Sequence, residues 1–268
     1  MGKTVGFIGA GNMATAIIDG VIKNKSIDKE NIYVYDIDEN AVNRMVTQKG
    51  INSSESVLEL QKKSDIIVLA VKPQTYSVVL AELKKEVDIT KVFVTIAAGI
   101  SIAYIQKELE CACPCVRAMP NTPLLLGQGA TAICPSENID EQSYGVIYNM
   151  FAMSGVCKKL PESLMNTVIA VNGSSPAYIY LFAKAMVDFA VEQGIEESTA
   201  LSLVCATLKG SASMLEKSGD TPSELIDKVC SKGGTTIEAI KTLEEKDFYS
   251  SIKLAMQNCN NRAEELGK

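Results

Sequence analysis

The sequence predicts a two-domain protein: a doubly wound, mostly parallel α/β domain followed by an all-helical domain. Two observations lead to this prediction. Short apolar segments rich in β-branched residues alternate with helical segments up to about Leu160. After Pro161 no further strand-like segment occurs, and helical spacing continues to the end of the sequence. We therefore expect a first domain at residues 1–161 and a second domain at residues 162–268.

Seven segments of the first half are expected to form strands. Several are apolar without alternation, which indicates burial on both faces, as in a parallel sheet covered by helices. Ser56 and Glu59 have the spacing of a capping box and predict a helix that ends near Ser64. The expected strands are Thr4–Ile8, Ile32–Tyr35, Ile66–Val71, Val92–Ile96, Cys115–Ala118, Ala130–Cys134 and Val156–Leu160.

The second half is expected to be helical, with glycines separating the helices. Its segment Ala177–Val191 is apolar almost all the way round, so it forms either the core of the helical domain or a subunit interface. The expected helices are Glu162–Val171, Pro176–Gln193, Glu196–Lys217, Pro222–Cys230, Thr236–Glu244 and Asp247–Glu265.

The composition is that of an ordinary globular protein, with 47% hydrophobic and 22% charged residues among 268. A formal net charge of −6 argues against nucleic acid or an anionic membrane as the main partner. No apolar run approaches the roughly 20 residues of a membrane span, and the run Val5–Ile8 is too short for a signal-peptide core. We therefore expect a cytoplasmic protein.

Histidine is absent from the sequence, which excludes Ser-His and Cys-His nucleophile pairs. The eight cysteines could be disulfides or metal ligands, but neither interpretation is favoured. Cys111, Cys113 and Cys115 alternate without Cys-x-x-Cys spacing, and no histidine is present to complete a zinc site. We expect reduced cysteines that serve as small core residues, and no bound metal.

A glycine turn follows the first expected strand and opens a helix. Its Gly-x-Gly-x-x-Ala pattern, ending at Ala14, is the dinucleotide-binding fingerprint of Rossmann domains. The first glycine permits the tight turn, the second lets the backbone approach a pyrophosphate, and the helix N-terminus offers N–H groups to the phosphates. The residues of this turn expected to contact the cofactor are Gly9, Gly11, Asn12 and Met13.

An acidic residue, Asp36, ends the second expected strand, 22 positions after Ala14. In this place it would accept hydrogen bonds from the adenosine ribose hydroxyls and repel a 2′-phosphate. The cofactor is therefore NADH or NADPH, with NADH preferred. The alternative is that Asp36 and Asp38 only flank a helix start, where acidic residues are favourable.

Three further turns are expected at the cofactor, because ligands of open α/β sheets bind outside the carboxyl ends of the strands. One follows the third strand and contains a lysine that could hold a ribose hydroxyl or a phosphate, or could simply be a surface lysine. Another follows the fourth strand. The third is a rigid loop between Pro120 and Pro123, which can present amide groups to a nicotinamide carboxamide. The expected contacts are Ala70, Val71 and Lys72, then Ala97, then Asn121.

A second ligand site is indicated in the helical half. Residues 229–237 place two glycines and three hydroxyl side chains at a helix N-terminus. Backbone N–H groups there form a ready site for a carboxylate, and Ser231, Thr235 and Thr236 can donate further hydrogen bonds. We expect a threonine to cap this helix in any case, and such a cap does not exclude a ligand.

Five motifs together resemble pyrroline-5-carboxylate reductases, over essentially the whole chain. They are Gly9-x-Gly-x-x-Ala14, Ala70-Val-Lys-Pro73, Met119-Pro-Asn-Thr-Pro123, Gly173-Ser-x-Pro-Ala-Tyr178 and Ser231-x-Gly-Gly-x-Thr236. The resemblance implies hydride transfer from NAD(P)H to the C=N carbon of 1-pyrroline-5-carboxylate, which gives L-proline, the last step of proline biosynthesis. It also implies a Rossmann domain followed by a helical domain that forms an intertwined homodimer, often assembled further into rings.

Carried over from this family, Lys72, Ala97 and Asn121 contact the nicotinamide half of the cofactor. Two positions depart from the family pattern: Ser175 replaces the usual glycine, and Asp36 stands where many relatives carry small or basic residues suited to NADPH. The substrate carboxylate and ring nitrogen are bound by Ser231, Gly234, Thr235 and Thr236, of which Ser231 and Thr236 are the catalytic candidates.

A protein without histidine suits this reaction. A protonated cyclic imine is already electrophilic, so positioning and a hydrogen bond to nitrogen matter more than a strong base. Two alternatives stay open. A β-hydroxyacid dehydrogenase would need a catalytic lysine one turn into the helix near Pro176, but the nearest is Lys184. A nicotinamide-binding regulatory protein without turnover is disfavoured because Ser231 and Thr236 are retained.

Overall fold

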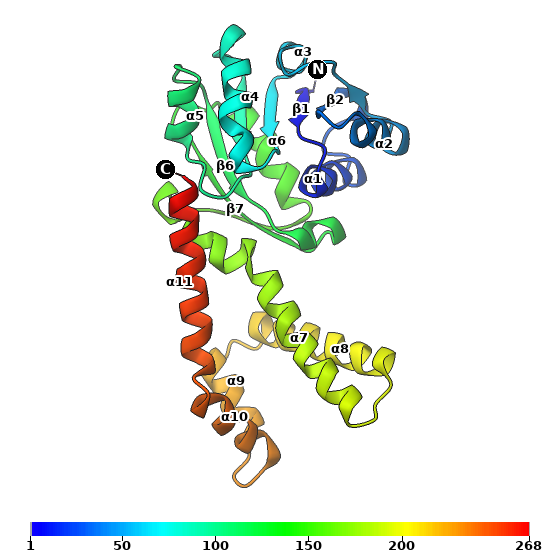
Figure 1. The fold of residues 1–268 in the computed structure, drawn as a ribbon, viewed down its shortest axis with the longest axis vertical. Helices are drawn as coiled ribbons and strands as arrows, with labels where there is room; N and C mark the ends of the chain where they lie inside the picture. Colours follow the sequence, from blue (N-terminus) through cyan, green and yellow to red (C-terminus); the bar gives the residue numbers. More distant parts are fainter. Residues whose placement is uncertain (1, 268) are drawn as a thin grey trace. The chain divides into compact units, whose positions relative to one another are not determined.

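The structure is a computed structural model that describes residues 2–267. In this part of the chain, strands form a single sheet in the order β3-β2-β1-β4-β5-β6-β7-β8 (Figure 1). Strands β1 to β6 run parallel, whereas β7 is antiparallel to β6, and β8 follows the direction of β7. The strands are β1 Val5–Ile8, β2 Ile32–Tyr35, β3 Asn52–Ser53, β4 Ile66–Leu69, β5 Val92–Thr95, β6 Cys115–Met119, β7 Gly129–Pro135 and β8 Gly155–Lys159.

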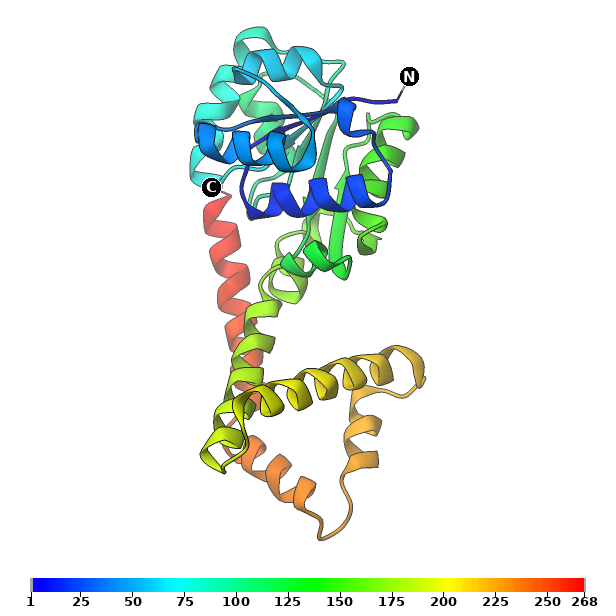
Figure 2. The ribbon, with the colours of Figure 1, turned by 90° about the vertical axis from the view of Figure 1, so that its right-hand side faces the viewer.

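Helices cover both faces of this sheet (Figures 1 and 2), which confirms the doubly wound fold. Helices α1, α2 and α6 share one core with side chains such as Phe7 and Val68, and α3, α4 and α5 share the other with Ile8 and Leu69. Neighbouring strand residues thus alternate between two buried faces, which explains their continuous apolar runs. The helices are α1 Asn12–Lys23, α2 Glu39–Lys49, α3 Val57–Lys63, α4 Tyr76–Leu83, α5 Ile102–Glu108 and α6 Glu141–Ala152.

The remainder of the described chain is helical, as predicted. Five of the six expected helices form, as α7 Ser175–Glu192, α8 Glu197–Lys217, α9 Pro222–Val229, α10 Thr235–Glu245 and α11 Phe248–Leu266. The helix expected over residues 162–171 does not form. The chain there makes a 3-10 turn at Glu162–Leu164 and a π-helical turn at Ile169–Gly173, and Met165 and Ile169 from this stretch are buried in the core of the α3–α4–α5 face.

The chain divides into two compact units. One comprises the described residues up to Pro176 together with those from Cys259 onward, and the other comprises Ala177–Asn258. This division differs from the predicted boundary after Pro161. Residues 162–176 join the first unit because Met165 and Ile169 are buried in the core of the α3–α4–α5 face, and the end of α11 joins it through Ala263.

Side-chain caps fix the starts of many helices. Asp38, Ser101, Asp140, Glu196 and Thr221 accept hydrogen bonds from first-turn N–H groups of α2, α5, α6, α8 and α9. The predicted capping box of α3 is only half formed. Ser56 accepts the Glu59 N–H at 3.1 Å, but the Glu59 carboxylate accepts the Glu55 N–H and pairs with Lys63, so it does not return to Ser56.

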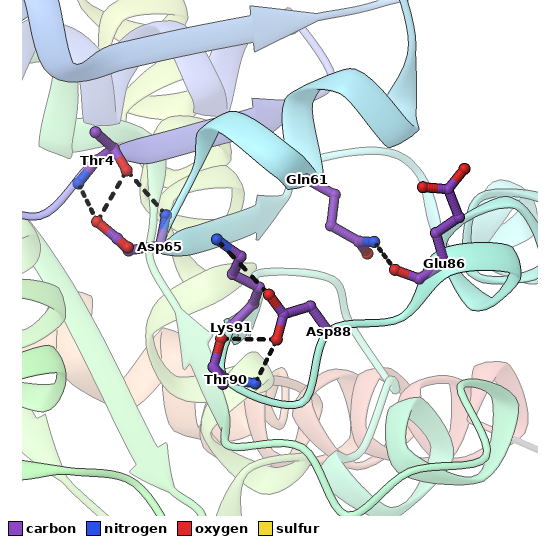
Figure 3. A network of polar contacts seen from close by, with 7 residues as sticks. All are labelled: Thr4, Gln61, Asp65, Glu86, Asp88, Thr90 and Lys91. Carbon is purple, nitrogen blue, oxygen red and sulfur yellow. Dashed lines mark hydrogen bonds and ion pairs between the residues drawn. The ribbon is translucent and has the colours of Figure 1, made fainter.

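The amino ends of β1 and β4 are joined by hydrogen bonds between Thr4 and Asp65, and separate polar contacts lie before β5 (Figure 3). The N–H and hydroxyl of Thr4 donate to Asp65 at 2.8 and 2.9 Å. Burial opposes ionisation of Asp65, but these hydrogen bonds and the charges of Lys3 and Lys91 lower its pKa. These contacts satisfy the strand ends at the edge opposite to the expected ligand edge, so we assign them a structural role.

None of the helices within residues 2–267 combines the length and apolar character required to cross a membrane.

Candidate cofactor and substrate sites

The glycine turn lies between the carboxyl ends of β2 and β4. The Gly9 N–H donates to the Tyr35 carbonyl at 2.7 Å, and Gly9 has a φ of +112°. A Cβ at Gly9 would lie only 2.6 Å from the Ala70 carbonyl oxygen. Only glycine fits both the left-handed conformation and this close approach, which confirms the reason given for a glycine at this point of the turn.

The next glycine, Gly11, faces open space. It is the N-cap residue of α1 and supplies no side-chain cap, and a Cβ at this position would meet no heavy atom within 4 Å. Ala14, one turn later, is fully buried against the sheet. The α1 N-terminus therefore offers uncapped N–H groups beside free space, which is what a pyrophosphate requires.

Asp36 is bound to the glycine turn by its own side chain. Its Oδ2 accepts the Ala10 N–H at 2.7 Å, and its Oδ1 accepts the Asp38 N–H at 2.9 Å. The helix-start role belongs to Asp38, the N-cap residue of α2, and not to Asp36. Each Asp36 oxygen keeps further acceptor capacity, so the carboxylate can still receive ribose hydroxyls.

A cavity of about 330 Å³ lies beside Asp36, along the carboxyl ends of β2 and β3. It contains the carboxylates of Asp36, Glu39 and Glu55, and none of its lining residues is a lysine or arginine. The full lining consists of Tyr35, Asp36, Ile37, Glu39, Val42, Asn43, Ser53, Ser54 and Glu55.

The remaining predicted cofactor residues follow β4, β5 and β6, which are successive parallel neighbours in the sheet. Ala70 and Val71 are half-buried, Lys72 is exposed, and Ala97 is buried. The structure thus brings all predicted cofactor residues to one edge, the carboxyl edge of the sheet. The turns after β4 and β5 are connected inside the core, where the Tyr76 hydroxyl donates to the Leu69 carbonyl at 2.7 Å and bonds to Thr95 at 2.8 Å.

Asn121 is at this edge, but its side chain is already used by the protein. It is only 8% exposed; its Oδ1 accepts the Ala130 N–H at 2.8 Å, and its Nδ2 donates to the Asn172 carbonyl at 3.1 Å. The side chain therefore holds the loop that carries it. Any contact of this loop with a nicotinamide falls mainly to its backbone.

The predicted substrate residues cluster at the start of α10, within the helical unit. Gly234 is the N-cap residue, so the predicted threonine cap is wrong. A Cβ at Gly234 would lie 2.4 Å from the Ser231 hydroxyl, and the Gly234 N–H donates to the Ser231 carbonyl at 3.0 Å. Gly233 has a φ of +74°. The glycine pair thus lets the Ser231 hydroxyl lie against the helix N-terminus, next to Thr235 and Thr236.

The α10 and α1 N-termini share one feature: both have glycine as N-cap residue and no side-chain cap. Six other helices, α2, α3, α5, α6, α8 and α9, are capped by side chains. The two helices for which the sequence predicts an anionic ligand are thus left open to one.

Thr236 also lines a largely apolar cavity of about 480 Å³ in the helical unit. Met214, Leu225, Ile226 and Ile240 are among its other lining residues. A hydroxyl in such surroundings forms stronger hydrogen bonds than one in water.

The cysteines of the described chain are unpaired thiols and do not gather with other potential metal ligands. All eight are free, and no group of three potential ligands gathers within residues 2–267. Burial raises the pKa of Cys111 and of Cys157 to about 11, so both are thiols at neutral pH.

Comparison with known proteins identifies the family. The chain is 37% identical over 268 residues to the pyrroline-5-carboxylate reductase of Escherichia coli, covering all of both chains. It is also 37% identical over 266 residues to that of Methanosarcina acetivorans, covering 99% of this chain and 98% of the relative. The chain belongs to the pyrroline-5-carboxylate reductase family. The predicted resemblance is therefore confirmed.

The fold agrees with this family along the whole chain. The crystal structure of Plasmodium falciparum pyrroline carboxylate reductase with NADP bound superposes with a TM-score of 0.92 at 29% identity, covering 99% of this chain and 98% of the other. A family model for pyrroline-5-carboxylate reductase dimerisation matches residues 162–266, and one for NADP oxidoreductase, coenzyme F420-dependent, matches residues 4–99. Ser175, which the sequence analysis noted in place of the family's usual glycine, is the first residue of α7.

One residue of interest was missed by the sequence analysis. Asn172 lies in the junction before α7, and its amide bonds to both β6 and β7. The sequence shows only an Asn-Gly-Ser-Ser-Pro break, which is typical of a plain helix junction. Nothing in the local pattern points to partners more than 40 positions away.

Proposed function

We propose that the protein reduces 1-pyrroline-5-carboxylate to L-proline with a reduced nicotinamide dinucleotide. The observation that carries the proposal is the 37% identity to a pyrroline-5-carboxylate reductase across the whole chain. The aligned region includes the N-termini of both α1 and α10, which have glycine as N-cap residue. A β-hydroxyacid dehydrogenase is less favoured, since the relatives at 37% identity are pyrroline-5-carboxylate reductases along the whole chain.

The residues at the carboxyl edge of the sheet fit a dinucleotide. The open space at Gly11 and the uncapped N-terminus of α1 suit the pyrophosphate, and Asp36 suits the adenosine ribose. In this proposal Lys72, Ala97 and the loop at Asn121 contact the nicotinamide half, and Ala70 and Val71 also contribute to the cofactor site. When bound, the reduced nicotinamide supplies the hydride for the C=N carbon.

The substrate is assigned to the start of α10. In this proposal the uncapped N–H groups of the helix and the Ser231 hydroxyl bind the substrate carboxylate. Thr236 donates a hydrogen bond to the ring nitrogen and holds it as the imine becomes an amine. The reaction consumes one hydride and one proton, and Thr236 acts by placing the proton and not by strong basicity, which agrees with a chain that contains no histidine.

NADH is the proposed preferred cofactor. A 2′-phosphate would have to enter a cavity with three carboxylates and no basic lining residue, whereas a free 2′-hydroxyl can donate to Asp36. The NADH preference is proposed for this chain alone. The Plasmodium falciparum relative has been crystallised with NADP.

We also propose that the protein acts as a homodimer or a larger assembly of dimers. The dimerisation family model covers the helical half, and α7 exposes Ile179, Tyr180, Leu181 and Phe182 in succession, each at least 43%. Four consecutive helical residues point to all sides, so α7 lacks a core of its own within one chain. The cytoplasmic location and the absence of nucleic-acid and membrane partners, expected from composition, also stay part of this proposal.

The test is an assay of the purified full chain with 1-pyrroline-5-carboxylate and either NADH or NADPH. We expect nucleotide oxidation that depends on the imine, with one L-proline formed per nucleotide. A Gly234→Ala variant, in which the added Cβ would meet the Ser231 hydroxyl, should mainly raise KM for the imine. Absence of proline with both nucleotides would refute the proposed reaction.

A further inference from the structure

Two asparagine side chains tie the junction before α7 to the sheet. The Nδ2 of Asn172 donates to the Met119 carbonyl at 2.8 Å and to the Ala130 carbonyl at 2.7 Å. Asn121 in turn donates to the Asn172 carbonyl at 3.1 Å and accepts the Ala130 N–H at 2.8 Å. We name this set of four hydrogen bonds the asparagine brace.

The brace joins three segments that are distant in sequence: the end of β6, the start of β7 and the π-helical turn Ile169–Gly173. Its surroundings are tightly packed. Met119 is 5% exposed, and a Cβ at Gly173 would lie 3.2 Å from the Met119 sulfur. Water therefore has little room to replace the two carbonyl partners if the Asn172 amide is lost.

The orientation of Asn172 is set by its donors. Both hydrogens of its amide are used by carbonyl groups, whereas its Oδ1 is buried without a partner. A buried acceptor without a donor costs free energy, so the site fits an amide chosen for its two donors. This pattern indicates that Asn172 serves to hold the Met119 and Ala130 carbonyls in place, even though its own Oδ1 is left without a hydrogen-bond donor.

The braced loop begins where β6 ends, at the carboxyl edge of the sheet. Strand β6 is the parallel neighbour of β5, whose following turn contains Ala97, so both turns face the expected nicotinamide end of the cofactor. We propose that Asn172 is a positioning residue for this end: it fixes the backbone of residues 119–121 in the conformation that orients the nicotinamide for hydride transfer. This inference rests on the proposed function, because it assumes a nicotinamide at this edge.

The inference makes a prediction that a purely structural role does not. The adenosine and pyrophosphate half is held at Gly9–Met13 and Asp36, at the ends of β1 and β2, away from β6 in the sheet order. Loss of the brace should therefore spare binding of ADP-ribose, which lacks the nicotinamide, and weaken only the additional affinity of NADH. General loosening of the domain would weaken both ligands together.

The experiment measures binding of NADH and of ADP-ribose by calorimetry, together with kcat, for wild type and Asn172→Ser. We expect ADP-ribose affinity to stay within about twofold, and both the NADH-to-ADP-ribose affinity ratio and kcat to fall about tenfold, as for two lost hydrogen bonds. Asn138→Ser is the matched control. Asn138 also donates its amide to a loop carbonyl, that of Ala112 at 2.8 Å, but it lies beyond the opposite end of β7.

An unchanged affinity ratio in Asn172→Ser, or a parallel loss for both ligands, would overturn the inference. A second measurement needs no variant. Amide hydrogen exchange of the wild type should show slow exchange at Ala130, with further slowing in peptides of residues 117–131 on addition of NADH but not of ADP-ribose. Equal slowing by the two ligands would also refute it. A wild type that binds NADH but forms no proline would refute the proposed reaction alone, because the binding comparison requires no imine.

Discussion

In the proposed cofactor site, the carboxylate of Asp36 would serve the fold and the ligand together. Its two oxygens hold the Ala10 and Asp38 N–H groups, so the side chain is already oriented before any cofactor binds. Such preorganisation reduces the entropy lost when the ribose hydroxyls bind. The same orientation makes the repulsion of a 2′-phosphate hard to relieve by rotating the side chain.

Substitution of Asp36 should therefore change cofactor choice. We expect wild-type enzyme to favour NADH over NADPH in kcat/KM by roughly tenfold to a hundredfold, as for charge-assisted hydrogen bonds of about 1–3 kcal/mol. Asp36→Ser should reduce the NADH-to-NADPH ratio of kcat/KM. The reduction should be smaller at high salt, where the repulsion between Asp36 and the 2′-phosphate is already screened. Asp36→Asn controls for shape, since it keeps an acceptor for Ala10 but no charge. A wild type that prefers NADPH would show that Asp36 has only the structural role.

Thr236 is the second residue whose chemistry can be tested alone. If its hydroxyl places the proton on the ring nitrogen, Thr236→Ala should lower kcat about a hundredfold and leave the NADH dissociation constant unchanged. Thr236→Ser keeps the hydroxyl and should recover most of the rate. Steady-state kinetics and NADH titration of the three proteins check this. A normal kcat in Thr236→Ala would remove the residue from the mechanism.

At the scale of secondary structure, the sequence predicted what depends on local patterns. The buried strands were predictable because their residues are apolar on both faces, and the helical half was predictable from its spacing and glycine breaks. Strand β3 was missed because it consists of only two residues, Asn52 and Ser53. The helix expected from Glu162 was wrong because tertiary packing overrides local spacing there: Met165 and Ile169 are buried in the sheet core, and the chain takes a 3-10 and a π-helical turn instead.

The candidate site divides in the same way. The glycine turn and Asp36 were predictable because the motif is local and its geometry is dictated by backbone sterics. The cap of α10 was mispredicted because the contact between Gly234 and the Ser231 hydroxyl depends on how the preceding turn folds back. The use of the Asn121 side chain within the protein was also out of reach, since one of its partners, Asn172, is 51 residues away.

Helix α8 offers a test of capping by pH. Hydrogen bonds from the Ser198 hydroxyl, and from the Ser198 and Thr199 N–H groups, lower the pKa of Glu196 to about 2, from 4.5 when unperturbed. A lowered folded-state pKa stabilises the protein above pH 4.5, and this stabilisation is lost as the pH falls from there toward 2.

Glu196→Gln should therefore lower Tm by roughly 2–4 °C at neutral pH, and the difference from wild type should shrink below pH 4.5. Glu197→Gln is the control, because Glu197 lies in the same first turn but is not the N-cap residue. Calorimetric melting curves at several pH values measure the effect. A difference that is constant down to pH about 2.5 would contradict an ionised cap.

At the scale of the whole molecule, the exposed apolar helices of the second unit require a partner surface. Leu181 and Phe189 of α7 are 71% and 64% exposed, and large apolar side chains gathered in this way mark an interface in a protein without a membrane-crossing helix among its described residues. The dimerisation family model over residues 162–266 indicates that the partner is a second copy. Stability should then depend on protein concentration, because dissociation would expose this surface.

Leu181→Asp tests this directly, since it places a charge without a partner where the proposed interface would exclude water. We expect wild type to sediment as a dimer or a multiple of it, with a Tm that rises with concentration, and Leu181→Asp to weaken dimerisation about thirtyfold or more. Val78→Asp makes the same change at an equally exposed site on α4, at 71%, and should leave assembly intact. Because the proposed substrate site at the start of α10 lies in the helical unit that the dimerisation family model covers, we expect activity to fall together with dimer content. An active monomeric wild type, or a Leu181→Asp protein that assembles as tightly as Val78→Asp, would mean that α7 is covered by something other than a second copy of this chain.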